Sequence, residues 1–355
     1  MILLNPGPVN LSDRVRHALL KPDLCHRESE FTTLQNEIRE QLISIYGLAA
    51  QHYVAILLTG SGTSAMEAML TSLIPQGKKV AIIENGVYGE RLRRIAEIYA
   101  IPHVSVQHEW GAEMEISRVA KALAGDNISH LAVVHHETTT GRLNPLQLLG
   151  ELCKEHGVRM LLDGVSSFGA EAIPFHESRI DACAATANKC LHGVPGTSFV
   201  IVSRTALDDA VERSLYLNLK AYFVNQEHGG TPFTQSVQTF YALHEALKEL
   251  SEQGGQPSRY ERYRQLAGQV REGLQALGIK PLLAVEDSSV VLSTYHLPEG
   301  INYASFHDAL KQDGFIIYAG QGELAKTMFR VSTMGEITGA DLALFLDSVE
   351  KIVGD

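Results

Sequence analysis

Short apolar runs alternate with amphipathic stretches through most of this chain, and this alternation constrains the fold more than any other feature. Each run has the length of a buried β-strand, and the stretches between them carry apolar residues at the spacing of one helix face. Such alternation predicts an α/β domain whose mostly parallel sheet is covered by helices on both faces. The runs lie at 53–59, 79–84, 103–107, 131–135, 158–163, 182–187 and 199–203, with helical stretches at 64–73 and 88–99 among them.

The pattern becomes helical and charged from residue 235 to about residue 277, with one interruption at 254–257. Later strand-like runs at 290–295, 315–318 and 328–331 accompany helical stretches at 304–313 and 339–352. These elements predict a smaller α+β domain, because a chain of 355 residues exceeds the length at which one core stops growing. We expect an N-terminal arm lining the active site over residues 1–15, a large domain over 16–255 and a small domain over 256–355.

Composition narrows the classes of function. The formal net charge is −11 and no basic run offsets it, so we expect no nucleic-acid partner. The first residues contain no basic segment and only a brief apolar run, and no stretch approaches the length of a membrane span. The four cysteines show neither CxxC spacing nor a disulfide framework, so we expect a reducing cytoplasm and no metal site. An inert buried thiol is favoured over a redox-sensitive one for Cys190.

Lys189 stands between two predicted strands, in the segment 186–196, where small residues surround it. Lysine side chains are normally exposed. A lysine that is removed from water has a lowered pKa and becomes a nucleophilic amine able to form a Schiff base. Because of its position we interpret Lys189 as such an amine rather than as a solvated surface charge.

A glycine-rich segment at 59–63 follows one predicted strand and opens a helix. Backbone N–H groups at a helix start favour a phosphate, and here they belong to Ser61, Gly62 and Thr63. The glycine spacing also fits the dinucleotide fingerprint, and Glu84 ends the next strand at about the right distance for a ribose. On this segment alone a phosphate cradle and an NAD-binding dehydrogenase are evenly matched, with a helix-capping turn close behind.

Two further residues follow strands. Asp163 ends the run 158–163, where burial of a carboxylate is unfavourable without a partner such as a protonated pyridine nitrogen. The alternative for Asp163 is a helix cap. Tyr88, flanked by glycines, can stack on a planar cofactor or pack in the core. A phosphate cradle, a pyridinium partner, a stacking aromatic and a Schiff-base lysine together predict pyridoxal phosphate. A dehydrogenase leaves Asp163 and Lys189 without a role.

These segments resemble the class V aminotransferases of fold type I, and within that group the chain is most similar to the 2-aminoethylphosphonate aminotransferases. The resemblance extends from about residue 2 to the C-terminus. It implies pyridoxal phosphate as cofactor and a homodimer whose active sites lie at the subunit interface. It is carried by the segments 5–8, 60–63, 136–141, 163–167, 188–190, 329–331 and 335–337.

The resemblance also implies a role for each matching residue. Lys189 carries the cofactor and transfers the proton, and Asp163 faces the pyridine nitrogen. Tyr88 stacks on the ring opposite Val165, and Thr138 bonds the ring hydroxyl. The phosphate is held by Ser61, Gly62, Thr63 and Asn188, with Thr234 contributed by the neighbouring subunit. The substrate is expected to contact Pro6, Gly7 and Arg330, whereas His26 and Arg27 do not match the family pattern and are placed near the expected substrate entrance by their position in the chain. Arg330 grips the anionic end, since its guanidinium suits phosphonate and carboxylate alike.

Two segments depart from the transaminase pattern. The chain has Cys-His-Arg-Glu at 25–28 where those enzymes typically have Cys-Thr-Trp-Asp, and Thr-Gln-Ser at 234–236 where they have Thr-Ser-Pro. The change to Arg27 adds a fixed positive charge near the expected substrate entrance, and neutral drift is the alternative reading.

The leading hypothesis is transamination of 2-aminoethylphosphonate with pyruvate or another keto acid, giving phosphonoacetaldehyde and an amino acid. The alternative is a related ammonia-lyase that converts 1-hydroxy-2-aminoethylphosphonate to phosphonoacetaldehyde and ammonia. An NAD-binding dehydrogenase is more remote.

Overall fold

A seven-stranded sheet forms the centre of the larger part of the molecule, in a computed structural model that describes residues 1–354. Neighbouring strands are parallel except at β10, which runs antiparallel to both of its neighbours. The strand order across the sheet is β2 (Tyr53–Gly60), β10 (Gly196–Ser203), β9 (Ile180–Thr186), β8 (Arg159–Asp163), β5 (Ile128–Val134), β3 (Lys79–Glu84) and β4 (His103–Gln107). The predicted α/β class with a mostly parallel sheet is confirmed.

Successive side chains of each strand enter two different hydrophobic clusters, because side chains alternate across a sheet. In β2, Ala55 and Leu57 belong to one cluster, whereas Ile56 and Leu58 belong to the other. Helices therefore cover both faces. The first cluster includes α2 (Ser29–Ser44), α5 (Ile116–Leu123), α6 (Leu146–Glu155) and α8 (Val237–Glu252), and the second includes α3 (Gly62–Leu73), α4 (Val87–Ile98) and α7 (Leu219–Glu227).

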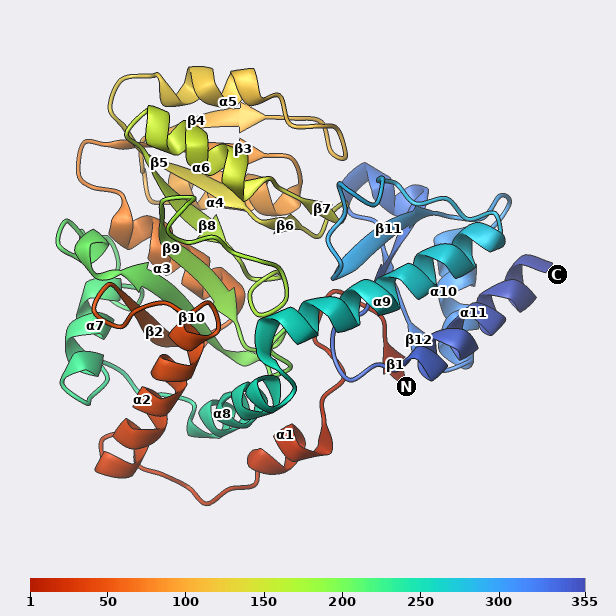
Figure 1. Cartoon of the computed structure of the whole chain (residues 1–355), viewed down its shortest axis with the longest axis horizontal. Helices are drawn as coiled ribbons and strands as arrows, with labels where there is room; N and C mark the ends of the chain where they lie inside the picture. Colours follow the sequence, from red (N-terminus) through yellow and green to blue (C-terminus); the bar gives the residue numbers. More distant parts are fainter. Residues whose placement is uncertain (355) are drawn as a thin grey trace.

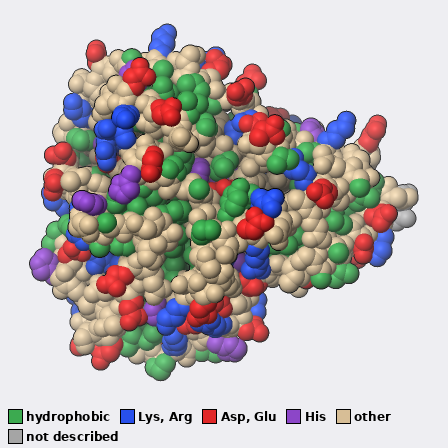
Figure 2. Space-filling model, in the orientation of Figure 1, with side chains coloured by type: hydrophobic (Ala, Val, Ile, Leu, Met, Phe, Trp, Pro, Cys, Tyr) green, Lys and Arg blue, Asp and Glu red, His purple; other side chains and the backbone are tan. Residues whose placement is uncertain are grey.

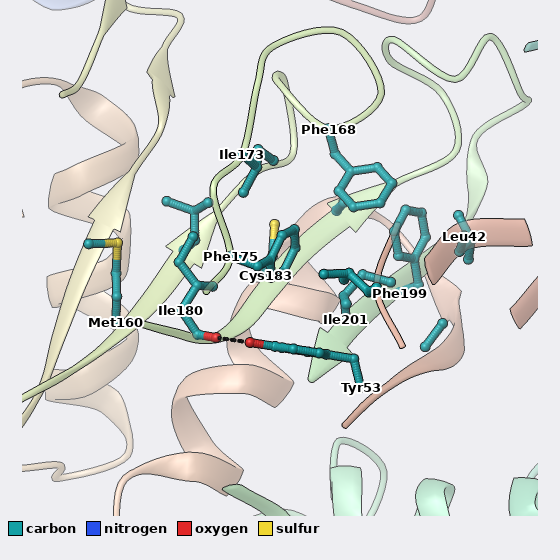
Figure 3. Close-up of a cluster of buried hydrophobic side chains, with 14 of the residues drawn as sticks. Leu42, Tyr53, Met160, Phe168, Ile173, Phe175, Ile180, Cys183, Phe199 and Ile201 are labelled. Atoms are coloured by element: carbon teal, nitrogen blue, oxygen red, sulfur yellow. Dashed lines mark hydrogen bonds between the residues drawn. The ribbon is translucent and has the colours of Figure 1, made fainter. Parts of the chain in front are cut away.

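Figure 3 shows part of the first cluster, with Met160 of β8, Cys183 of β9 and Phe199 of β10 among its labelled side chains. The rings of Phe168 and Phe199 meet edge to face, with their centroids 5.1 Å apart. The Tyr53 hydroxyl in this cluster is satisfied, because it donates to the carbonyl oxygen of Ile180 at 3.3 Å. Close packing of this kind fixes the positions of β8, β9 and β10 relative to one another.

A second, smaller group of elements surrounds an antiparallel sheet of three strands and has its own hydrophobic cluster. Helix α9 (Gly255–Ala276) leads into it from the larger part, and the N-terminus lies beside it (Figure 1). Its strands are β11 (Leu292–His296), β14 (Met328–Ser332) and β13 (Tyr318–Ala319), and its other helices are α10 (Tyr303–Gln312) and α11 (Gly339–Gly354). Helix α9 begins close to the predicted domain boundary, although the boundary itself stays a prediction.

The expectation of one strand at 315–318 is wrong. Phe315 and Ile316 form β12 (Phe315–Ile316), which pairs with β1 (Ile2–Leu3), whereas β13 pairs with β14. The chain therefore crosses between two sheets within a few residues, because the apolar run is divided between two different partners. The remaining short elements are α1 (Asp13–Ala18), β6 (His136–Glu137), β7 (Arg142–Leu143) and two 3-10 turns at Arg204–Leu207 and Gly322–Lys326.

The surface carries charges of both signs. On the face shown in Figure 2, acidic and basic side chains are interspersed. Over residues 1–354, no helix has both the length and the apolar character that crossing a bilayer requires.

Candidate active site

Asp163 and Lys189 come from adjacent strands of the large sheet. Asp163 is the last residue of β8 and pairs with Ala184 of β9 in a parallel register. Lys189 follows the end of β9 by three residues, since that strand ends at Thr186. Parallel strands place their carboxyl ends at one edge of a sheet, where α/β proteins bind ligands. The structure therefore brings both predicted residues to the same edge.

The Lys189 amine lies against the N-terminal arm. Its Nζ donates a hydrogen bond to the carbonyl oxygen of Pro6. Gly7 has a φ of +108°, and a Cβ there would lie 2.8 Å from Nζ, so this close approach requires glycine. Burial lowers the pKa of Lys189 to about 8, and the positive charges of Arg330 and Arg91 act in the same direction. An appreciable fraction of the amine is therefore unprotonated near neutral pH.

The Asp163 side chain is 3% exposed. Within residues 1–354 its carboxylate has one hydrogen-bond donor, the Val165 backbone N–H at 2.9 Å from Oδ1. Burial raises the pKa of Asp163 to about 7. A buried carboxyl group with so few donors is unfavourable alone, and a protonated ring nitrogen would supply the missing partner.

The start of α3 has the features of an anion site. Ser61 is the N-cap, with extended backbone angles and no capping hydrogen bond from its side chain, so that side chain leaves the N–H groups of Gly62 and Thr63 available to an anion. A Cβ at Gly62 would lie 2.8 Å from Cγ2 of Val165, so these two residues can approach closely only because one of them is glycine. The Thr63 hydroxyl accepts a hydrogen bond from Arg91 Nη1 at 3.3 Å.

Arg91 was not predicted from the sequence. Its guanidinium lies 4.7 Å from the centroid of the Tyr88 ring, which is half-buried in the first turn of α4. The contact follows from helix geometry, because residues three apart share one face. The three-residue spacing of Tyr88 and Arg91 in the helical stretch was the sequence signal that could have indicated this contact. Arg91 thus brings a positive charge to both the predicted stacking ring and Thr63.

Glu137 is a second residue of the site that was not predicted from the sequence. It is fully buried, and its carboxylate accepts hydrogen bonds from Gly89 N at 3.2 Å and from Thr139 Oγ1 at 2.6 Å. Burial raises the pKa of Glu137, which these donors oppose. The carboxylate thereby ties the turn beside Tyr88 to the turn that contains Thr138. The sequence signal that could have indicated this role was an acidic residue inside the segment 136–141, which carries the family resemblance.

Arg330 reaches the site from β14, in the smaller part of the molecule. It is 4% exposed, and burial lowers its pKa. Its Nε donates to the carbonyl oxygen of Ala319 at 2.8 Å, and its Nη1 donates to that of Thr138 at 3.0 Å. These two bonds fix the guanidinium plane and leave the Nη2 edge for an anion, because the group has five N–H donors in total.

The Asn188 side chain is oriented by its neighbours, since its Oδ1 accepts from Thr186 Oγ1 at 2.8 Å. Thr234, by contrast, is exposed. His26 is half-buried and Arg27 is exposed, on the loop between α1 and α2. No hydrogen bond or ion pair connects these last three residues with Lys189 in the part of the chain that the structure describes. Their roles stay predictions.

The dehydrogenase alternative depended on Glu84 facing a ribose. Glu84 is 4% exposed, and its carboxylate accepts from Arg93 Nε at 2.9 Å and from the Ser105 hydroxyl. The carboxylate is thus occupied by an internal ion pair, which gives Glu84 a structural role at the end of β3.

Comparison with known proteins agrees with this geometry. The family described as aminotransferase class-V matches residues 16–341. The 2-aminoethylphosphonate–pyruvate transaminase of Vibrio vulnificus is 36% identical over 360 residues, covering 99% of this chain and 97% of the relative. The enzyme of the same name from Bacillus cereus is 34% identical, with the same coverage.

Solved structures give the same result. The alanine–glyoxylate aminotransferase of a Nostoc species superposes with a TM-score of 0.92 at 26% identity, covering 99% of this chain and 95% of that one. The ureidoglycine–glyoxylate aminotransferase of Bacillus subtilis superposes with a TM-score of 0.91 at 26% identity, covering 99% and 92%.

Proposed function

The chain belongs to the class-V aminotransferase family, and from this premise we propose that it transfers the amino group of 2-aminoethylphosphonate to pyruvate, giving phosphonoacetaldehyde and alanine. One observation carries the proposal: the buried Arg330 guanidinium is bonded to the Thr138 carbonyl oxygen and is close enough to Lys189 for its charge to lower the pKa of that amine. An amine donor for this site must therefore present an anionic group a short distance from its nitrogen. The full-length similarity to transaminases with this activity supports the choice of a phosphonate.

Pyridoxal phosphate is the cofactor of this family, and the residues present fit it. The start of α3, which its N-cap side chain leaves uncapped, suits the phosphate, and the buried Asp163 carboxyl suits the ring nitrogen. When bound, the cofactor supplies an aldehyde that takes up an amine and a ring that accepts electrons from the adjacent carbon. We assign Ser61, Gly62, Thr63 and Asn188 to the phosphate, Tyr88 and Val165 to the two ring faces, and Thr138 to the ring hydroxyl.

Lys189 is the proton carrier in this proposal. With a pKa lowered to about 8, its Nζ can both remove and return a proton near neutral pH. Its Nζ would take the proton from the carbon that bears the substrate nitrogen and would hold that proton for its return. In the second half of the reaction the same amine moves the proton back, now toward the keto acid carbon. Pro6 and Gly7 hold the amine in place from the arm.

Arg330 serves both half-reactions. Its free N–H edge binds the phosphonate of the amine donor first and the carboxylate of pyruvate second, because a guanidinium pairs in a bidentate manner with either anion. The two backbone carbonyls that fix its plane allow this without rearrangement.

The proposal includes a homodimer. Thr234 is exposed on the chain described here, and we assign it to the cofactor phosphate of the neighbouring subunit. His26 and Arg27 are assigned to the substrate entrance. Sedimentation of the loaded protein at working concentration tests the assembly, and a fully active monomer would contradict it. We also retain a cytoplasmic location, which cell fractionation tests.

The deciding experiment incubates the loaded enzyme with 2-aminoethylphosphonate and pyruvate and measures alanine. The expected result is alanine in a one-to-one ratio with phosphonoacetaldehyde. A parallel incubation replaces the donor with 1-hydroxy-2-aminoethylphosphonate and omits pyruvate. Ammonia in the second incubation, with no alanine in the first, would overturn the transaminase in favour of the lyase.

A further inference from the structure

His192 has a backbone conformation that its residue type rarely adopts. Its φ is +62°, in the left-handed region that favours glycine. Its N–H donates to the carbonyl oxygen of Lys189 at 2.9 Å, and the next N–H, of Gly193, donates to Ala187 at 2.8 Å. The turn that presents the Lys189 amine is therefore closed by a strained residue. Strain of this kind persists only where the surroundings hold the residue in place.

The His192 ring supplies that restraint. It is 1% exposed, and its Nε2 accepts from the Gly335 N–H at 3.0 Å and contacts the Tyr263 hydroxyl. Because a backbone N–H can only donate, Nε2 is the acceptor and Nδ1 carries the proton. Nδ1 then donates to Glu336 Oε1 at 3.2 Å. Burial lowers the pKa of His192 to about 3, so the ring stays neutral.

The partners belong to segments far away in the sequence. Tyr263 lies in the early part of α9, and from the same helix Arg259 Nη1 donates to the Cys190 carbonyl oxygen at 2.6 Å. An apolar cluster fills the space beside these bonds and joins the arm, the lysine turn, α9 and the C-terminal segment. Its buried members are Val9, Ala170, Cys190, Tyr263, Val291 and Met334.

Gly335 and Glu336 follow the last residue of β14, the strand that carries Arg330, by three and four residues. The His192 ring therefore connects the turn of the proton-transferring amine with the chain segment of the anion-binding guanidinium. We propose that His192 is a positioning residue that fixes the Lys189 turn relative to Arg330 through Glu336, Gly335 and Tyr263. The proposal rests on the proposed function only in taking Arg330 as the group that binds the substrate anion.

The expected consequence is selective. A substrate anchored by its anion needs the amine and the guanidinium at a fixed separation, and a misplacement of about 1 Å can slow a reaction by roughly a hundredfold. A neutral amine has no such anchor, so its reaction depends on Lys189 alone. Loss of the His192 contacts should therefore affect anionic amines much more than neutral ones.

The test compares four variants. His192→Gly relieves the backbone strain but removes the ring, and His192→Asn keeps a residue that tolerates this φ and can still reach toward Glu336. Tyr263→Phe removes one hydroxyl only. Asp287→Asn is the matched control, because it breaks another contact between the same two parts, the Arg142 Nη1–Asp287 Oδ1 ion pair at 3.0 Å, without touching the lysine turn.

Two measurements are made on each loaded variant. The first is hydrogen exchange at the amides of 192 and 193, which His192→Gly should accelerate at least tenfold and Asp287→Asn should leave unchanged. The second is the rate at which the cofactor absorbance responds to 2-aminoethylphosphonate and to neutral 2-aminoethanol. For His192→Gly we expect a tenfold to hundredfold loss with the first amine and less than threefold with the second. The loss of rate with 2-aminoethylphosphonate in Tyr263→Phe and in His192→Asn should lie between the losses in His192→Gly and in Asp287→Asn.

The proposal would be overturned if His192→Gly lost the same factor in rate with both amines. It would also be overturned if hydrogen exchange at the amides of 192 and 193 were unchanged in that variant. So would a loss of the same size in Asp287→Asn. Failure of the proposed function gives a different result, because the unaltered enzyme would then respond no better to the phosphonate than to 2-aminoethanol. In that case β-alanine, whose carboxylate lies at a similar distance from its nitrogen, replaces the phosphonate in the same comparison.

Discussion

Arg330 Nη1 donates a hydrogen bond to the backbone carbonyl oxygen of Thr138 at 3.0 Å, which joins the small antiparallel sheet to the turn between β6 and β7. The guanidinium is thereby held against the turn of Thr138, the residue that we assign to the ring hydroxyl of the cofactor. This single bond relates the anion-binding group to the reacting centre.

Arg330→Lys should weaken the phosphonate and the carboxylate substrate together. A lysine keeps the charge but loses the planar fork and the bonds to Thr138 and Ala319. We expect kcat/KM to fall tenfold to a hundredfold for both substrates, as removal of a charged hydrogen bond worth about 1.5–3 kcal/mol predicts. Steady-state kinetics with each substrate varied in turn measures this. An effect on only one of them would show that the two anions bind at separate sites.

Lys189→Ala should abolish turnover and covalent attachment of pyridoxal phosphate. Borohydride reduction of the loaded enzyme followed by intact mass measurement should show one cofactor per chain in the unaltered protein and none in the variant. Circular dichroism checks that the variant is folded. A reduced cofactor attached to another lysine would contradict the assignment.

Asp163→Asn should stabilise the protein that lacks cofactor and yet impair the reaction. In the folded chain the pKa of Asp163 is raised from 3.8 to about 7, so its ionisation destabilises the fold. The penalty is absent below about pH 4, grows as the pH rises and is complete above pH 7, where it amounts to a few kcal/mol. Melting temperatures of both cofactor-free proteins at pH 4 and pH 8 measure it. A variant that melts lower at pH 8 would contradict this account, whereas slow turnover supports the ring-nitrogen role.

Arg91→Gln should weaken cofactor binding. The change removes the positive charge that contacts the Tyr88 ring and the Thr63 hydroxyl, and we expect roughly a tenfold rise in the Kd for pyridoxal phosphate, about 1.4 kcal/mol. Arg94→Gln is the control, because the Arg94 side chain on the same helix is 69% exposed and forms an ion pair with Glu97 at the surface. Fluorescence titration of cofactor-free protein gives both constants. Equal constants for the two variants would exclude a role for Arg91.

Cys25 should be the one cysteine that reacts readily with thiol reagents in the folded protein. It is exposed, whereas Cys153, Cys183 and Cys190 are buried. Burial raises the pKa of Cys153 and of Cys190 to about 12, which suppresses the reactive thiolate. Mass spectrometry after brief maleimide treatment should show one adduct, absent in Cys25→Ser. Rapid modification of Cys190 would instead indicate a redox-sensitive thiol beside Lys189.

The sequence was sufficient for the parts of the site that follow from local pattern. Asp163 ends one apolar run and Lys189 follows the next, and parallel pairing of the two neighbouring strands then places them at one edge. The start of α3 was recognisable because a glycine-rich loop that leads into a helix is a recurrent form of anion-binding site. The family match confirms the aminotransferase reading, and with it the cofactor.

The parts that could not be predicted depend on contacts between distant segments. His192 and Tyr263 are 71 positions apart, and no periodicity in one chain indicates that they meet. The divided strand at 315–318 has the same cause, since only the fold shows that its two halves face different partners. Helix α2 was missed although Phe31, Ile38 and Leu42 follow a helical spacing, because polar and β-branched residues between them weaken the pattern.

The antiparallel direction of β10 has an evolutionary consequence. Parallel neighbours in a sheet are joined by crossover connections, which can lengthen at the surface. Strands β9 and β10 are instead antiparallel and consecutive, and the segment that joins them contains Lys189. An insertion there would displace the reactive nitrogen itself. New substrate preferences in descendants of this chain should therefore arise by remodelling other loops, while the length of this hairpin stays constant.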